Sequence, residues 1–201
     1  TASVFINDNE SGLLMGEAMT KEQLIKQIAE AFSDVKLGNG IGLYEADCLD
    51  AYLDPSSEEY GFWKRKDERD NWLKLMPILL HTADSPYSHG SPGFPGKRWE
   101  RWSWSSNWCF MDAEGRRFIL PCYLIRELEK PQEYDNPIVF ALTDDDASRR
   151  EFLALLTGEQ KKALIAFIEY QIDAAADADD IVDFEDYQKC LSILRLQCPP
   201  H

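Results

Sequence analysis

The sequence between Trp99 and Leu128 reads WERWSWSSNWCFMDAEGRRFILPCYLIREL, and the prediction of the fold starts from it. In its first half, aromatic side chains recur at even spacing, which places them on one face of an extended strand. They are Trp102, Trp104, Trp108 and Phe110, of which Trp108 and Phe110 are expected to pack in the core of a small sheet. The sequence DAEG at 112–115 then predicts a turn. The spacing therefore predicts a β-hairpin over residues 102–120.

Two registers of this hairpin are open. A three-residue loop with Gly115 in the left-handed conformation pairs Asp112 with Arg116 and brings the apolar faces of both strands together. A two-residue loop pairs Asp112 with Gly115 and turns those faces apart. Because a one-residue slip turns over the whole apolar set, we favour the three-residue loop. Pro121 has no N–H to donate, so the second strand is expected to end there and a helix to follow.

Residues Asp112–Leu124, with the sequence DAEGRRFILPCYL, resemble a motif of a bacterial domain family of unknown function. Gly40–Tyr52 and Thr157–Phe167 resemble two further parts of the same family, so the likeness extends over about two thirds of the chain. The chain departs from the family at Cys122, where the family often has alanine, and in its Trp-rich insert. The family has no established activity, and the resemblance therefore implies no catalytic residue.

The chain is strongly acidic. Its 201 residues include 36 acidic and 21 basic side chains, which gives a formal net charge of −15. Binding to nucleic acid or to an anionic membrane needs clustered basic residues, so this charge argues against both partners. It favours solubility and encounter with a basic protein. A solvated acidic surface explains the same charge without a dedicated interface, and both interpretations stay open.

Cysteine usage predicts the cellular compartment. The five cysteines form no CxxC pair, which is typical of reduced and mostly buried thiols in a cytoplasmic protein. No run of eighteen apolar residues is present. The first nineteen residues lack a basic start and a long apolar stretch, so no secretory signal is expected. These patterns predict a cytoplasmic location.

The remaining segments predict a mainly helical chain. Thr20 and Thr157 each precede a Gln at the third helical position, which is the capping-box pattern of a helix start. The sequence NPIVFAL at 136–142 predicts a strand that pairs with the hairpin. Helices are predicted within 20–38, 43–53, 58–76, 122–130, 144–156, 157–172 and 187–198.

The predicted architecture is α+β. About six helices are expected to enclose a small antiparallel sheet built on the 102–120 hairpin. Residues 20–201 are expected to form a single domain, preceded by a loosely ordered segment at 1–19. Proline and glycine crowd residues 82–98, which predicts a long loop just before the Trp-rich strand.

Three motifs suggest ligand chemistry without having its spacing. The acidic stretch 173–186 has apolar residues where an EF-hand needs calcium ligands, so a solvated linker is the better interpretation. Gly38–Gly42 lacks the spacing of a phosphate loop and is interpreted as a turn after a helix. His89 and Ser91 lie in a loop rather than in a nucleophile elbow. No metal and no cofactor is therefore expected.

Two groups of residues remain as candidate sites. An aromatic group with an interleaved arginine is typical of the anchors of a protein interface. Its members are Tyr87, Trp99, Arg101, Trp102 and Trp104. An acidic group would suit Mg²⁺ binding or acid–base catalysis if the 43–54 helix and the 112–115 turn converge. Its members are Glu45, Asp47, Asp50, Asp112 and Glu114. A polar helix face and an ordinary turn explain the same carboxylates without a site.

Three functional hypotheses follow. The preferred one is a non-enzymatic protein, immunity-like or antitoxin-like, that binds a basic partner. The alternative is a carboxylate- or metal-dependent enzyme with its site between the 43–54 helix and the 112–115 turn. The third is a small-ligand pocket lined by Trp and Tyr under the 82–98 loop. The sequence leaves the oligomeric state open.

Overall fold

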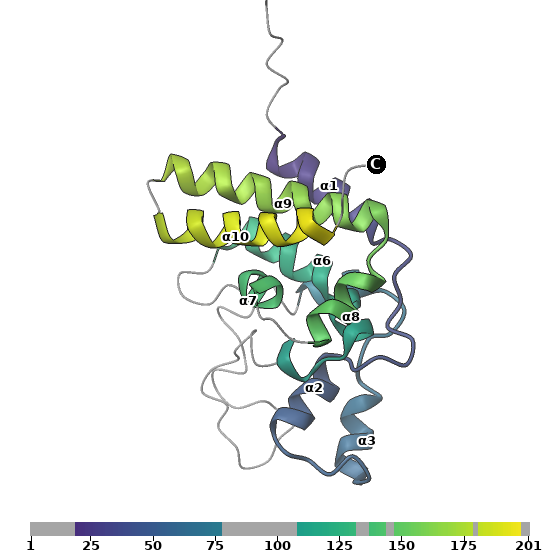
Figure 1. The fold of residues 1–201 in the computed structure, drawn as a ribbon. Coiled ribbons are helices and arrows are strands. Elements are labelled where there is room, and N and C mark those ends of the chain that lie inside the picture. Colours follow the sequence, from purple (N-terminus) through teal and green to yellow (C-terminus); the bar gives the residue numbers. More distant parts are fainter. Residues whose placement is uncertain (1–18, 78–107, 132–136, 144–146, 179–180, 198–201) are drawn as a thin grey trace, which may run out of the picture.

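A computed structural model describes residues 19–77, 108–131, 137–143, 147–178 and 181–197 (Figure 1). Within these ranges every assigned element is a helix, so the predicted α+β fold is wrong. The elements are α1 (Lys21–Ala31), α2 (Leu43–Asp50), α3 (Glu58–Lys64), the 3-10 helix η1 (Trp72–Leu75), α6 (Ala113–Glu129), α7 (Pro137–Thr143), α8 (Ala147–Leu155), α9 (Gly158–Asp177) and α10 (Ile181–Gln197).

The fold is built around α6, which is formed by the second half of the stretch quoted at the start. All its residues from Gly115 to Leu128 are buried except Arg117, which is half-buried. The helix packs against α1, α7, α8 and η1. Helix α9 packs against both α1 and α10. A helix that is covered on every side is apolar around most of its circumference. This explains why its residues show no single apolar stripe.

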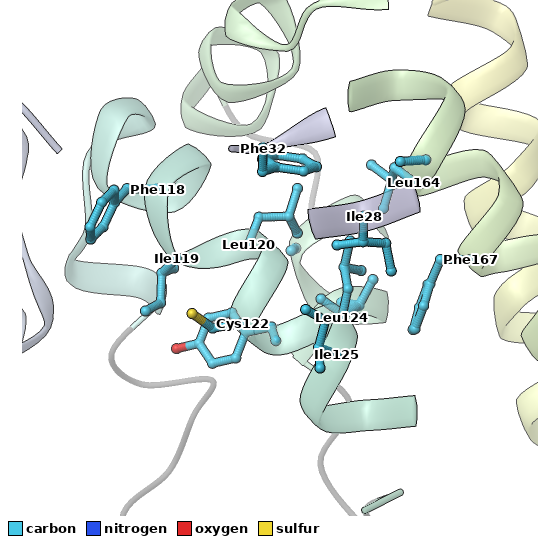
Figure 2. Close-up of a cluster of buried hydrophobic side chains, with 14 of the residues drawn as sticks. Ile28, Phe32, Phe118, Ile119, Leu120, Cys122, Leu124, Ile125, Leu164 and Phe167 are labelled. Carbon is cyan, nitrogen blue, oxygen red and sulfur yellow. The ribbon is translucent and has the colours of Figure 1, made fainter. Parts of the chain in front are cut away.

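The main core lies between α1, α6 and α9. Figure 2 shows Ile28 of α1 and Leu164 and Phe167 of α9 gathered around Leu120 and Leu124 of α6. These five side chains are at most 1% exposed. Full burial of a side chain of this size stabilises a protein by roughly 1.5–3 kcal/mol. The contacts join segments far apart in the sequence, so the core depends on most of the chain.

The hairpin prediction fails at its turn, because that sequence begins a helix. Asp112 is the N-cap of α6, and its side chain accepts a hydrogen bond from the backbone N–H of Gly115 at 2.8 Å. The N–H of Arg116 donates to the carbonyl of Asp112 at 2.9 Å, which closes the first helical turn. Ala113 and Glu114 have the same αR conformation in a type I turn as in a helix. The local sequence therefore suits both structures, and packing of the apolar run selects the helix.

Pro121 lies inside α6 instead of ending a strand. Its missing N–H removes one helical hydrogen bond, and a proline in a helix interior costs about 3 kcal/mol. The residues on both sides of Pro121 are buried, so tertiary packing outweighs this local cost. Upstream, residues 108–110 form a helical turn and Trp108 is buried in the core as predicted, although it lies on no sheet.

The predicted strand at 136–142 is also wrong, because this segment forms α7. Pro137 is its first residue, a position where proline is favoured since its N–H would have no helical partner. Ile138, Ala141 and Leu142 are buried, and they recur at helical spacing. A short apolar run suits a strand and a buried helix equally well, so periodicity alone could not separate them.

Several helix boundaries match the predictions and others differ. Both capping boxes, at Thr20 and Thr157, are confirmed. The helix predicted over 58–76 is divided into α3 and η1. Helix α1 ends at Ala31, before the predicted end near Gly38, and α9 extends to Asp177, into the stretch predicted to be a linker. Residues 1–18 and the predicted loop 82–98 lie outside the described residues.

Candidate functional site

A group of charged and hydroxyl side chains connects α2, α3 and the segment that follows α3. We call this group the polar centre. It consists of Glu45, Tyr60, Lys64, Asp67 and Arg69. Figure 1 places α2 and α3 at the end of the molecule opposite α9 and α10. The polar centre therefore lies at the end of the described structure that is opposite the helix pair α9 and α10.

Glu45 is the acceptor at the middle of the polar centre, and it is only 3% exposed. It accepts hydrogen bonds from the Tyr60 hydroxyl at 2.6 Å, from Lys64 Nζ at 2.5 Å and from Arg69 at 3.2 Å. Burial alone would raise the pKa of this carboxyl, but hydrogen bonds from Lys64 and Tyr60 and the charge of Arg69 outweigh it. The pKa therefore lies below its ordinary value, and Glu45 is ionised at neutral pH.

Asp67 is the second buried carboxylate, and it caps the N-terminus of α2 from another segment. Its two oxygens accept hydrogen bonds from the backbone N–H groups of Tyr44 at 2.7 Å and Glu45 at 3.0 Å. Gly42, the N-cap of α2, lets the carboxylate come this close, because a Cβ there would lie 2.3 Å from the Asp67 carboxyl carbon. Burial raises the pKa of Asp67 to about 6, although both backbone hydrogen bonds act in the opposite direction.

Replacing Asp67 with Asn is expected to remove a pH dependence of stability. Because the pKa of Asp67 is raised from 3.8 to about 6 in the folded state, the folded protein binds more protons in this range and loses stability as the pH rises through it. The free energy of unfolding of the wild type, minus that of Asp67→Asn, should fall by roughly 2–3 kcal/mol between about pH 4 and 7. Urea unfolding across this range measures it, and a difference that does not change with pH would contradict the raised pKa.

The loop between α1 and α2 is held by Arg69 and by the start of α6. Arg69 donates hydrogen bonds to the carbonyls of Gly38 at 2.9 Å and Gly40 at 3.1 Å. One oxygen of Asp112 accepts from the N–H of Ile41 at 3.0 Å, in addition to its bond to the first turn of α6. The predicted glycine turn is therefore a link between the polar centre and the N-terminus of the central helix.

The polar centre has the properties of a structural connector. All four oxygens of its two carboxylates accept hydrogen bonds. Burial raises the pKa of the neighbouring Cys48 thiol to about 12, so the thiol is protonated at neutral pH and is a poor nucleophile. Within the ranges that the structure describes, no three His, Cys, Asp or Glu side chains are arranged to hold a metal ion.

The structure places the predicted acidic group only partly together. Glu45 is buried, whereas Asp47 and Asp50 are half-buried on α2. Asp112 contacts the loop that leads into α2. The exposed Glu114 lies beside the same loop, because its Cβ is 2.8 Å from the position that a Cβ on Gly40 would take. A shared catalytic or metal site stays a prediction. The aromatic group lies outside the described residues: Tyr87, Trp99, Arg101, Trp102 and Trp104.

Sequence reasoning missed Tyr60, Lys64, Asp67 and Arg69. The last three lie in the run KRKDERD, within the helix that is predicted over 58–76. Such a run gives no signal for which of its charges is buried, because the partners are Glu45 and two backbone amides that lie 19 to 24 positions away. Gly42, directly before α2, was the available local signal of a close approach.

A concave surface follows the outer face of α9. The cavity has a volume of about 370 Å³ and is lined by Met19, Ala166, Glu169, Tyr170, Asp173, Ala174 and Asp177. Three of these residues are acids at intervals of four, so they lie along one side of the helix. Glu169 is paired with Arg195 of α10 at 2.9 Å. The cavity is therefore acidic along its length and partly apolar.

Tyr52 stands out at the C-terminus of α2. The backbone N–H of Leu53 donates to the carbonyl of Cys48, and that of Tyr52 donates to the carbonyl of Leu49. These two hydrogen bonds form the Schellman motif of a helix C-terminus. This pattern places Tyr52 in the left-handed conformation, with a φ of 57°. Glycine usually occupies this position, and another residue there costs about 1–2 kcal/mol. The side chain of Tyr52 is 91% exposed, so little burial compensates for this cost.

Comparison with known proteins finds a family that matches part of the chain. No curated protein and no solved structure matches the chain. No helix within the described ranges is long and apolar enough to cross a bilayer. The family of unknown function DUF6714 matches residues 20–93, which include the whole polar centre and Tyr52. The Asp112–Leu124 motif lies outside this match, so that motif and a bacterial origin stay predictions. The chain is therefore similar to a family of unknown function over the segment that contains α1, α2, α3 and η1.

Proposed function

We propose that this protein is a non-enzymatic interaction module that binds a basic protein partner through its acidic surface. The observation that supports this function is where the charge lies. Among the described acids only Glu45, Asp67 and Glu127 are buried, and Glu45 is paired with Lys64 and Arg69. The other acids among the described residues are half-buried or exposed, so they present negative charge at the surface.

A surface of this kind favours rapid association with a partner of opposite charge. Long-range attraction raises the rate of encounter, and its effect falls as salt screens the charges. In its most specific form, the proposal is an immunity-like or antitoxin-like protein that covers a basic partner. The acidic C-terminal end of α2, with Asp50 and Asp54, is a described surface that offers carboxylates to such a partner.

The proposal is tested by the salt dependence of partner capture. Immobilised protein is incubated with extract of its source cell at about 50 mM and about 500 mM salt, which changes the screening length from roughly 14 Å to 4 Å. We expect a small set of basic proteins to be retained at low salt and released at high salt. The control is an unrelated protein with a similar net charge.

Two results would count against this function. One is that no protein is retained at low salt. The other is that the control retains the same proteins, because the acidic surface would then attract basic proteins without selectivity.

A further inference from the structure

Tyr52 is the most exposed large apolar side chain among the described residues. It occupies a backbone conformation that glycine adopts more easily, and its ring adds almost nothing to the core. Stability alone does not explain an aromatic residue here. Exposed aromatic side chains are, in contrast, frequent anchors of protein interfaces, because a rigid ring buries a large area when a partner covers it.

The charges around Tyr52 identify the chemistry of that partner. Residues 37–63 contain six acids and no lysine or arginine. Asp50 and Asp54 lie two positions on either side of Tyr52. Asp54 accepts hydrogen bonds from the N–H and the hydroxyl of Ser56, which lower its pKa and keep it ionised. The segment around Tyr52 therefore supplies carboxylates for a cation, and the described cations that pair with this segment, Lys64 and Arg69, are held by Glu45.

Other exposed surfaces fit a basic partner less well. Phe62 is 47% exposed, but Lys66 Nζ already lies 5.2 Å from the centre of its ring. Lys64 and Arg65, also exposed, lie two and three positions after it in the sequence. The groove along α9 has carboxylates, but its one aromatic residue, Tyr170, is half-buried. Tyr52 is the described residue that combines an exposed ring with flanking acids.

We propose that Tyr52, Asp50 and Asp54 form the docking point for an arginine side chain of the basic partner. The guanidinium group would stack on the ring of Tyr52 and donate hydrogen bonds to the flanking carboxylates. Arginine fits better than lysine because its planar group both stacks on an aromatic face and donates in parallel to a carboxylate. This inference rests on the proposed function and adds the surface and the partner residue.

The test uses a fluorescein-labelled nona-arginine peptide, with nona-lysine for comparison, and measures the dissociation constant by anisotropy. In Tyr52→Gly the dissociation constant for nona-arginine should rise about fivefold or more. In the same variant the midpoint of thermal unfolding should rise by about 3 °C, because glycine relieves the left-handed conformation. A purely structural role for Tyr52 would not combine greater stability with weaker binding.

A pair of double variants separates local recognition from net charge. Asp50→Asn/Asp54→Asn and the control Asp173→Asn/Asp177→Asn change the net charge equally, and Asn at position 54 keeps an acceptor for Ser56. The first should weaken binding about fivefold and the second less than about twofold. Equal losses from both pairs, or unchanged binding by Tyr52→Gly, overturn the inference and leave the proposed function standing. If the wild type binds nona-arginine no better than a charge-matched acidic protein does, the proposed function falls as well.

Discussion

Gly115→Ala is expected to lower the free energy of unfolding by about 3 kcal/mol. Gly115 lies in the first turn of α6, where alanine would ordinarily favour a helix. A Cβ at this position, however, would lie 2.1 Å from the carbonyl oxygen of Ile41. The backbone of Ile41 is itself held by its hydrogen bond to Asp112, so it cannot move away without losing that bond. The added methyl group therefore has to separate the loop from the central helix.

The control for this experiment is Gly158→Ala. Gly158 is also in the first turn of a helix, α9, but no atom lies within 4 Å of the position of its Cβ. Alanine there should be neutral or should stabilise the protein by up to about 1 kcal/mol. Urea unfolding of the two variants measures the contrast. Similar effects of the two substitutions would contradict the close approach of the 38–42 loop to α6.

Glu45→Gln is the second substitution with a large expected effect, a loss of about 3 kcal/mol at neutral pH. Glutamine keeps the volume of the side chain but removes the buried negative charge that Lys64 and Arg69 face. The pKa of Glu45 is lowered in the folded state, so its ionised form contributes stability that is lost as the pH falls through that pKa. The difference between wild type and variant should therefore shrink below about pH 4.5.

Glu30→Gln provides the matched control on the surface. Glu30 also faces a lysine, Lys26, but the two atoms are 3.8 Å apart and both side chains are largely exposed. Exposed pairs of this type contribute about 0.3–0.5 kcal/mol. Chemical unfolding at neutral and acidic pH should distinguish the two substitutions clearly. A loss at Glu45 no larger than that at Glu30 would show that the polar centre does not hold α2 and α3 together.

The features that the sequence predicted correctly are those set by a few neighbouring residues. Thr20 and Thr157 cap their helices through side chains three positions away, and the pattern of Thr and Gln is sufficient to recognise them. Trp108 was correctly expected in the core, although the expected core was that of a sheet and the actual one is helical. These predictions needed no knowledge of which distant segments meet.

The features that were missed depend on distant partners. The DAEG sequence suits a turn and a helix start equally well, and only the packing around α6 decides between them. Pro121 made a helix less favourable locally, although buried neighbours on both sides compensate. Asp67 became part of the candidate site because Gly42 leaves space for it, and nothing in the charged run around Asp67 indicates that contact. Long-range packing, rather than local preference, determined these elements.

The packing of α1 has a consequence for proteins that share only residues 20–93 with this chain. Leu24, Ile28 and Phe32 are 0% exposed, and α1 packs against α6 and α9. Both of these helices lie beyond residue 93, so the matched segment contains neither of them. Without such a cover, these side chains would face water and promote aggregation. A relative that carries only this segment should therefore bring a substitute cover, either from unrelated sequence of its own or from a second polypeptide.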